Sequence, residues 1–188
     1  MSIETAIIIS AMRGDRLAPK ISNSTNYKHW ISIKDERRCM ECANNHGKIW
    51  DIDDIPYPKP LLHPLCRCVI KIMQSIKAGT ATINNTDGAD WYLKFLGQLP
   101  EYYITKEDAK LNGWERGKWL SSFAPGKMIR SEVYKNRNGH LPQTQDRIWY
   151  EADINYKTGK RNSQRIIWSN DGLIFVTYDH YETFYEII

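Results

Sequence analysis

The sequence predicts an α+β fold for the second half of this 188-residue chain, preceded by a small cysteine-rich module. Two observations predict this division. All four cysteines fall between residues 39 and 68. The second half places helical patterns before a series of β-rich segments, an order typical of α+β domains. We therefore expect residues 1–76 to form the module, residues 77–86 to form a linker, and residues 87–188 to form N-terminal helices packed on a C-terminal antiparallel sheet.

The module gives few secondary-structure signals. Residues 1–27 mix short apolar runs with Ser, Asn and Thr and follow no firm period. Residues 51–64 contain four prolines, which predicts mostly loop, because proline fixes φ and lacks a backbone donor. Residues 75–86 are small and polar, which indicates a linker or a loose domain edge.

Two helices are expected at the start of the second half. Residues 87–96 repeat apolar side chains at helical spacing. Thr105 is expected to cap the next helix, because a hydroxyl there accepts a hydrogen bond from a free backbone N–H. Glu107 and Asp108 follow in the first turn, where carboxylates favour the helix dipole. Gly113 marks the end of this helix.

After residues 124–126, Ala-Pro-Gly, the pattern changes to short strands and turns. We expect strands within residues 130–142, 147–156, 165–169, 172–178 and 182–188, with turns at 136–139, 156–162, 169–172 and 179–180.

The strand at residues 147–156 separates its side chains by face. A period of two puts Trp149, Glu151 and Asp153 on one face. The other face carries Ile148, Tyr150, Ala152 and Ile154, which suit a core beneath the helices. We therefore expect Glu151 to point away from that core.

Residues 146–184 hold side chains that together could cut RNA without a metal. RNA carries its own nucleophile, the ribose 2′-OH, so cleavage needs a base, an acid and cations on the phosphate. Glu151 could take a proton, His180 could give one from a loop, and Arg161 and Arg165 could hold a phosphate. Spacing alone, however, favours a solvated face with surface ion pairs.

Residues from about 83 to 188 resemble the barnase-like ribonucleases, a family of small, extracellular, guanyl-preferring bacterial enzymes. The resemblance lies in LPEYYITKEDAKLNGW, APGK, NRNGHLP, EADINYKTGKRNSQRI and TYDHYETF, which occur in this order. It implies a barnase-like α+β fold and an endoribonuclease without a catalytic cofactor. Such an enzyme cleaves single-stranded RNA by transesterification through a 2′,3′-cyclic phosphate and refuses DNA, which lacks the 2′-OH.

The resemblance also implies a role for each matching residue. Glu151 matches the general base and His180 matches the general acid. Lys106, Arg161 and Arg165 match the cations that bind or stabilise the phosphoryl group.

The implied substrate-binding residues are Tyr134, Asn136, Arg137 and Tyr181. Asp153 matches a buried aspartate that holds the arginines. The loop departs from the family at Lys135, which replaces a serine, and at Asn138, which replaces the glutamate that reads guanine. A carboxylate accepts two hydrogen bonds from guanine, whereas an asparagine offers one acceptor and a donor. A preference for purines or guanine therefore stays open.

The cysteines form two short-spaced pairs, Cys39 with Cys42 and Cys66 with Cys68, and His63 lies between the pairs. These five residues are candidate ligands of a structural zinc. Two disulfides or four unpaired thiols are the alternatives.

Residues from about 25 to 72 resemble the head morphogenesis (minor head protein) domain of Mu-like phages, whose signature ends in a run similar to HPLCRC. Domains of this kind precede toxin domains in bacterial polymorphic toxins, so the resemblance implies a packaging or delivery module. The alternative is a phage-derived head assembly protein whose nuclease domain is incidental or inactive.

The basic excess lies in residues 1–82, with 12 Lys and Arg against 8 Asp and Glu; residues 83–188 hold 14 of each. Phosphate binding in the second half therefore depends on focused placement. The sequence has neither a run near the roughly 20 apolar residues of a membrane span nor a recognisable signal peptide. We expect a monomeric toxin, secreted or delivered to a target cell. Its expected partners are RNA and a barstar-like acidic inhibitor that covers Lys106, Arg161, Arg165 and His180.

Overall fold

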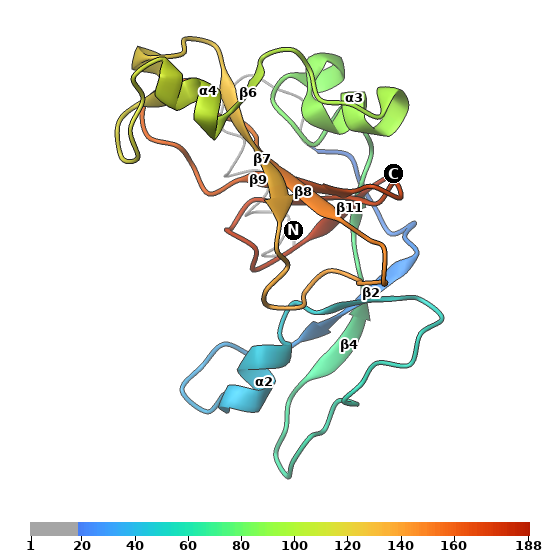
Figure 1. Cartoon of the computed structure of the whole chain (residues 1–188). Coiled ribbons are helices and arrows are strands. Elements are labelled where there is room, and N and C mark those ends of the chain that lie inside the picture. The colour runs from blue at the N-terminus through green and yellow to red at the C-terminus, as the bar shows by residue number, and fades with distance from the viewer. Residues whose placement is uncertain (1–18) are drawn as a thin grey trace.

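The computed structural model describes residues 19–188 and has an α+β fold with a large mixed sheet (Figure 1). Residues 1–18 of the expected module lie outside this range. Within residues 19–188 the strands form one eight-stranded and one three-stranded sheet. No helix in the described part of the chain is long and apolar enough to cross a membrane.

The large sheet contains strands from both halves of the chain. Its order is β1 (Ile21–Ser22), β5 (Ser75–Ile76), β11 (Tyr185–Ile187), β10 (Ile174–Thr177), β9 (Arg165–Ser169), β8 (Trp149–Asp153), β7 (Met128–Tyr134) and β6 (Tyr103–Thr105). The strands expected from the sequence are present, but the sheet is not purely antiparallel. β5 pairs with β11 in parallel, and so does β6 with β7. The long connection through a helix between β6 and β7 permits this parallel pairing.

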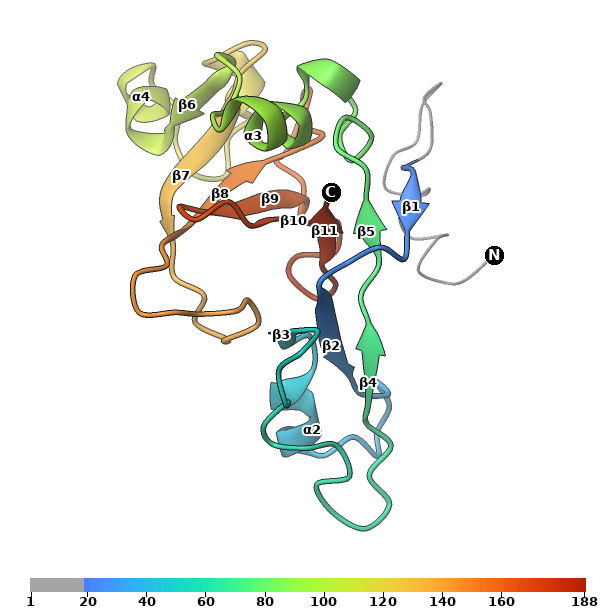
Figure 2. The same ribbon diagram turned by 90° about the vertical axis from the view of Figure 1, so that its right-hand side faces the viewer.

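Two helices lie at one end of the molecule, α3 (Ala89–Leu96) and α4 (Lys106–Leu111), with 3-10 turns η1 (Asn85–Asp87) and η2 (Leu120–Ser122) (Figures 1 and 2). The predicted cap of α4 is confirmed. The Thr105 hydroxyl accepts a hydrogen bond from the Asp108 backbone at 3.0 Å, and the Asp108 carboxylate accepts one from the Thr105 backbone. This reciprocal capping fixes the start of the helix.

Side chains on the central strands alternate between two hydrophobic cores. Ile166 and Val176 belong to the core beneath the helices, whereas their neighbours Ile167 and Phe175 belong to the core on the opposite face. Ala152 and Ile154 lie beneath the helices as predicted. Trp149 lies on the opposite face as predicted, but that face has a core of its own, in which Trp149 is buried. Ile148, expected in the core beneath the helices, is exposed.

The cysteine-rich module contains α2 (Met40–Asn45) and a small sheet of β3 (Ile49–Asp51), β2 (Tyr27–Ile31) and β4 (Val69–Ile72). Figure 2 shows the module at the end of the molecule opposite α3 and α4. The sequence did not predict these strands. The loop expected at residues 51–64 is present after β3.

The loose linker predicted at residues 77–86 is not what forms there. Ala78 and Ala81 are buried in the main core. The buried Asp90 carboxylate of α3 accepts hydrogen bonds from the backbone of Gly79 at 2.7 Å and of Ala81 at 2.9 Å. Small residues let this segment approach the helix closely, and Asp90 satisfies its backbone donors. The small, polar residues of this segment, which suggest a linker in the sequence, therefore let it pack against α3 and the main core.

The module and the sheet share the second core. Three module residues, Tyr27, Ile49 and Met73, pack there with Leu141, Trp149, Ile167, Phe175 and Phe184. The rings of Tyr27 and Phe175 meet edge to face, with centroids 5.3 Å apart. Because one apolar layer serves both parts, we expect them to unfold together.

Met73→Ala tests this shared core. Met73 is 1% exposed and its neighbour Ile72 is 60% exposed. We expect Met73→Ala to lower the free energy of unfolding by about 2–5 kcal/mol, and Ile72→Ala to change it by less than about 0.5 kcal/mol. Chemical denaturation, followed through tryptophan fluorescence, measures both. Two separate transitions, of which Met73→Ala shifts only one, would contradict a common core.

Candidate active site

Glu151 lies in β8, opposite Ser131 of β7 and Ile167 of β9. Its carboxylate accepts hydrogen bonds from the Ser131 hydroxyl at 3.2 Å and from the Tyr181 hydroxyl at 2.6 Å. Burial, together with the hydrogen bond to Glu151, raises the pKa of Tyr181 above its ordinary value. Tyr181 therefore remains a protonated donor near neutral pH, and the carboxylate is held from two sides.

Lys106 joins this arrangement through Ser131. It is the first residue of α4, and its Nζ donates to the Ser131 hydroxyl at 3.1 Å. A chain of hydrogen bonds thus runs from Lys106 through Ser131 and Glu151 to Tyr181. Ser131 was not among the predicted site residues. Its only sequence signal is a position on a strand, because the register that places it opposite Glu151 is a tertiary feature.

Asp153 holds both arginines, as the resemblance implies. Its carboxylate is 1% exposed and accepts hydrogen bonds from Arg161 Nε at 2.5 Å and Arg161 Nη2 at 2.7 Å. It also forms an ion pair with Arg165, whose Nε lies 3.2 Å away. Burial opposes the charge of Arg161, but the bonds and charge of Asp153 outweigh it and raise the pKa of that guanidinium. Arg165 begins β9 as expected, whereas Arg161 lies in the preceding loop.

His180 sits in a tight loop after β10. His180 and Tyr181 both adopt left-handed backbone conformations, with φ of +62° and +70°. Such backbone is strained for residues other than glycine and needs support from its surroundings. The Thr177 hydroxyl accepts the Tyr181 N–H at 2.9 Å, and the Asp179 carboxylate accepts the Thr183 N–H, also at 2.9 Å. These bonds leave the His180 imidazole exposed beside the Tyr181 ring, with centroids 4.9 Å apart.

An open pocket of about 410 Å³ lies beside Glu151. It is lined by Val133, Tyr134, Lys135, Asn136, Arg137, Asn138, Glu151 and Tyr181. The structure therefore brings all four predicted substrate-binding residues together with Glu151. Lys106, the two arginines and His180 are not part of this lining. The stacked rings of Tyr134 and Tyr181, with centroids 5.5 Å apart, form an aromatic wall.

Asn136 shapes the pocket loop with its side chain. Its amide donates to the Leu141 carbonyl at 2.9 Å, and its side-chain oxygen accepts the Leu141 N–H at 3.1 Å. The Gly139 N–H closes the predicted turn on the Asn136 carbonyl. The Asn136 amide therefore holds the loop to Leu141 through both its nitrogen and its oxygen.

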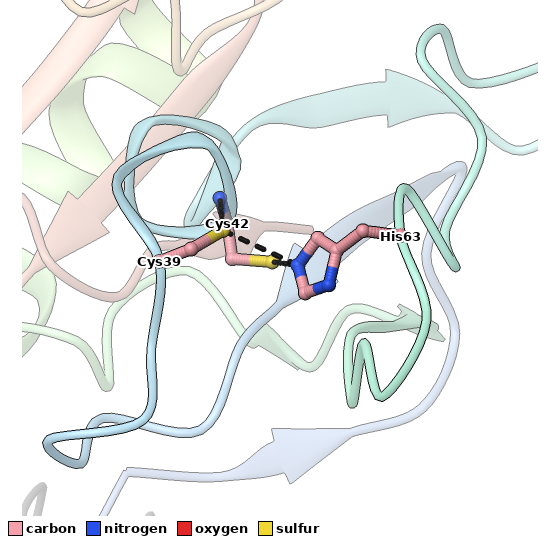
Figure 3. Close-up of side chains that lie close together, drawn as sticks. All are labelled: Cys39, Cys42 and His63. Carbon is pink, nitrogen blue, oxygen red and sulfur yellow. Dashed lines mark hydrogen bonds between the residues drawn. The ribbon is translucent and has the colours of Figure 1, made fainter.

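The predicted metal ligands also come together. The Sγ atoms of Cys39 and Cys42 each lie 3.3 Å from His63 Nε2 (Figure 3), and Cys42 Sγ lies 3.7 Å from Cys66 Sγ. Cys68 Sγ is within 4.8 Å of both Cys42 and Cys66. None of the four cysteines, all within the described residues, forms a disulfide.

The spacing of these atoms fits a tetrahedral metal site. With Zn–S near 2.3 Å and Zn–N near 2.0 Å, neighbouring ligands of zinc lie about 3.5–3.8 Å apart. His63 Nδ1 lies 2.8 Å from the Pro64 carbonyl, to which it can donate. In the neutral ring this bond leaves Nε2 unprotonated and facing the sulfur atoms. The ligand atoms form two groups within which all lie within 4.8 Å of one another, Cys39 with Cys42 and His63, and Cys42 with Cys66 and Cys68. Cys42 belongs to both groups.

Comparison with known proteins agrees with both resemblances. A family model described as ribonuclease matches residues 87–188, and one described as Phage Mu protein F like protein matches residues 3–71. A ribonuclease of Heyndrickxia coagulans is 48% identical over 108 residues, which cover 57% of this chain and 99% of the relative. Ribonucleases of Bacillus intermedius and Bacillus pumilus are also 48% identical over 108 residues, covering 57% of this chain and 67% of each relative. The chain therefore belongs to the ribonuclease family.

Proposed function

We propose that this endoribonuclease cleaves single-stranded RNA by metal-independent transesterification. Glu151 takes the proton of the ribose 2′-OH, whose oxygen then forms a bond to phosphorus. The bond from phosphorus to the 5′-oxygen breaks, and His180 protonates that oxygen. The products are a 2′,3′-cyclic phosphate and a free 5′-hydroxyl. The observation that carries this proposal is the Glu151 carboxylate, oriented by Ser131 and Tyr181 at the wall of an open pocket.

Fixed cations supply the electrostatic part of the proposed reaction. Negative charge grows on the phosphoryl oxygens in the transition state, and preorganised donors stabilise it most effectively. Ion pairs with Asp153 hold Arg161 and Arg165 in place. The hydrogen bond from Lys106 Nζ to the Ser131 hydroxyl holds that ammonium group near Glu151. A second proton donor or a metal is not needed for this chemistry.

Base recognition is proposed to occur in the pocket beside Glu151. The Tyr134 and Tyr181 rings offer a surface on which a base can stack. Backbone groups of residues 136–139 can still meet the edge of a purine. Asn138 replaces a carboxylate at the guanine-reading position, so we propose a purine preference weaker than that of the family.

Glu151→Gln and His180→Ala should each lower kcat/KM for RNA by about 10²–10⁴-fold, because each removes a proton-transfer group. Glutamine keeps one acceptor oxygen for one of the two hydroxyls, and its amide N–H can donate to the oxygen of the other, so Glu151→Gln should fold normally. Glu101→Gln, an exposed carboxylate outside the site, is the matched control.

The assay uses a defined single-stranded RNA with EDTA present, and the cut positions are mapped at the same time. Cuts after purines would support the proposed base preference. Wild-type rates in both variants would rule out the assigned roles. Loss of all activity on chelation, with the folded state intact by circular dichroism, would rule out the metal-independent mechanism.

We also propose a structural zinc in the module. The thiol and imidazole donors support it, as do the short distances from Cys39 Sγ and Cys42 Sγ to His63 Nε2 and from Cys42 Sγ to Cys66 Sγ. Native mass spectrometry should find one zinc per chain, and Cys42→Ser should lose it together with part of the thermal stability. Met40→Ala changes an exposed residue of the same helix and should keep the metal. A wild-type protein that contains no zinc and gains no stability from added zinc would refute the site.

We further propose that the chain acts as a delivered toxin with a barstar-like acidic inhibitor. The match to the Phage Mu protein F family at residues 3–71 supports a delivery module. Intracellular expression should arrest growth through RNA degradation, and Glu151→Gln should not. Titration with the acidic inhibitor should abolish cleavage by covering Lys106, Arg161, Arg165 and His180. Continued cleavage at saturating inhibitor would count against this partner.

The same match supports a second candidate function, in phage head assembly. Co-purification with capsid components, together with a failure to cleave RNA, would favour this second function over the first.

A further inference from the structure

A second open pocket lies where the module meets the loops of the ribonuclease half. We call it the module cleft; its volume is about 450 Å³, and its lining includes Arg38, His46, Lys48, Asn138, His140 and Glu182. Asn138 also lines the pocket beside Glu151. The two pockets therefore meet at this asparagine, and Glu182 is two residues from His180.

The module cleft has a net positive charge. Lys34 forms an ion pair with Glu182, and Arg38 and Lys48 provide two further cations. Burial lowers the pKa of His46 to about 4, and the charges of Lys34 and Arg38 lower it further, so His46 is neutral near pH 7. The lining thus holds two cations, Arg38 and Lys48, and one carboxylate, Glu182, which is already paired with Lys34. An anionic ligand is favoured in such a pocket, because its low-dielectric walls focus the field.

A third pocket adjoins the module cleft. It has a volume of about 660 Å³ and shares Lys48 and Asn138 with the cleft. Arg137, which also lines the pocket beside Glu151, borders it, as does Tyr57. The lining of this third pocket also holds the carboxylates of Asp51 and Asp54, whereas its cations Lys48 and Arg137 lie on the side shared with the other two pockets. Tyr57 is 87% exposed, which makes its ring available for stacking. Single-stranded nucleic acids bind to basic grooves that carry such aromatic rings.

We propose that the module cleft and the adjoining third pocket bind the RNA chain beyond the cleaved nucleotide. Arg38 and Lys48 contact backbone phosphates in the cleft, and Tyr57 stacks on a base at the third pocket. This inference rests on the proposed ribonuclease function and extends its substrate to several nucleotides. The continuity of the three pockets through Asn138 favours RNA over a protein ligand. The proposal also gives a role to the excess of basic residues in the first half of the chain. Two of them, Arg38 and Lys48, lie in the cleft beside a ribonuclease half that has no net charge.

The test compares substrates of two lengths. A dinucleotide reaches only the pocket beside Glu151, whereas a single-stranded RNA of about a dozen nucleotides reaches the cleft as well. The double variant Arg38→Ala/Lys48→Ala should cleave the longer RNA with kcat/KM about tenfold lower and the dinucleotide at the wild-type rate. The salt dependence for the longer RNA should also weaken by about 1.4 in log–log slope, the value for two phosphate contacts on a single strand.

Lys71→Ala/Lys77→Ala is the matched control, because both lysines are exposed and neither lines the cleft. Tyr57→Ala, a substitution in an exposed loop, should weaken cleavage of the longer RNA without affecting the fold. Equal losses for both substrate lengths, or no loss for either, would overturn the proposal.

Binding separates this inference from the proposed function. In the Glu151→Gln background, fluorescence anisotropy measures the Kd for a labelled RNA of the same length. Arg38→Ala/Lys48→Ala should raise this Kd about tenfold, even if the chain cleaves no RNA. An unchanged Kd would overturn the module cleft as an RNA site, whereas an absence of cleavage with a raised Kd would overturn only the catalytic proposal.

Discussion

The central strands of the large sheet carry apolar side chains on both faces, and both faces must be covered. The positions of the helices and of the module depend on this requirement. Ile166 and Val176 pack beneath the helices, whereas Ile167 and Phe175 face the module. Neighbouring residues of a strand point to opposite faces, so covering one face leaves the other exposed to water. In this chain the module supplies the second cover. Its position against the sheet also places it beside the loops that border the site.

One strand, β8, connects the shared core to the candidate site. Along the same face of β8, Trp149 lies in the shared core, Glu151 reaches the open pocket, and Asp153 pairs with two arginines. A buried carboxylate is costly without partners, so Asp153 requires the guanidinium groups that it positions. The packing that anchors Trp149 therefore also fixes the carboxylates that follow it. Stability and the proposed chemistry depend on the same five residues of strand.

The module contacts both loops that border the pocket. The Ile49 N–H donates to the His140 carbonyl at 2.7 Å, and Lys34 pairs with Glu182 in the loop that carries His180. Gly47 approaches this loop so closely that a Cβ there would lie 3.3 Å from the Glu182 carbonyl oxygen, and its φ of +81° also favours glycine. Cys42, in the helix that leads to Gly47, packs with Trp30, Cys66 and Cys68 in a small buried cluster. The module is thus positioned to influence the site through contacts as well as through charge.

The sequence by itself determined the capped helix α4 and the strands of the second half, and it predicted the chemical groups of the candidate site. Thr105 and Asp108 cap α4 because capping needs only neighbours in the chain, and the barnase-like segments identified Glu151, His180, Lys106, Arg161 and Arg165 together. The tertiary structure alone decided how these parts meet. It set the register that puts Ser131 against Glu151, the burial of the small residues at 77–86, and the core shared with the module. Strand register and the docking of distant segments depend on contacts between residues far apart in the chain, which local patterns do not encode.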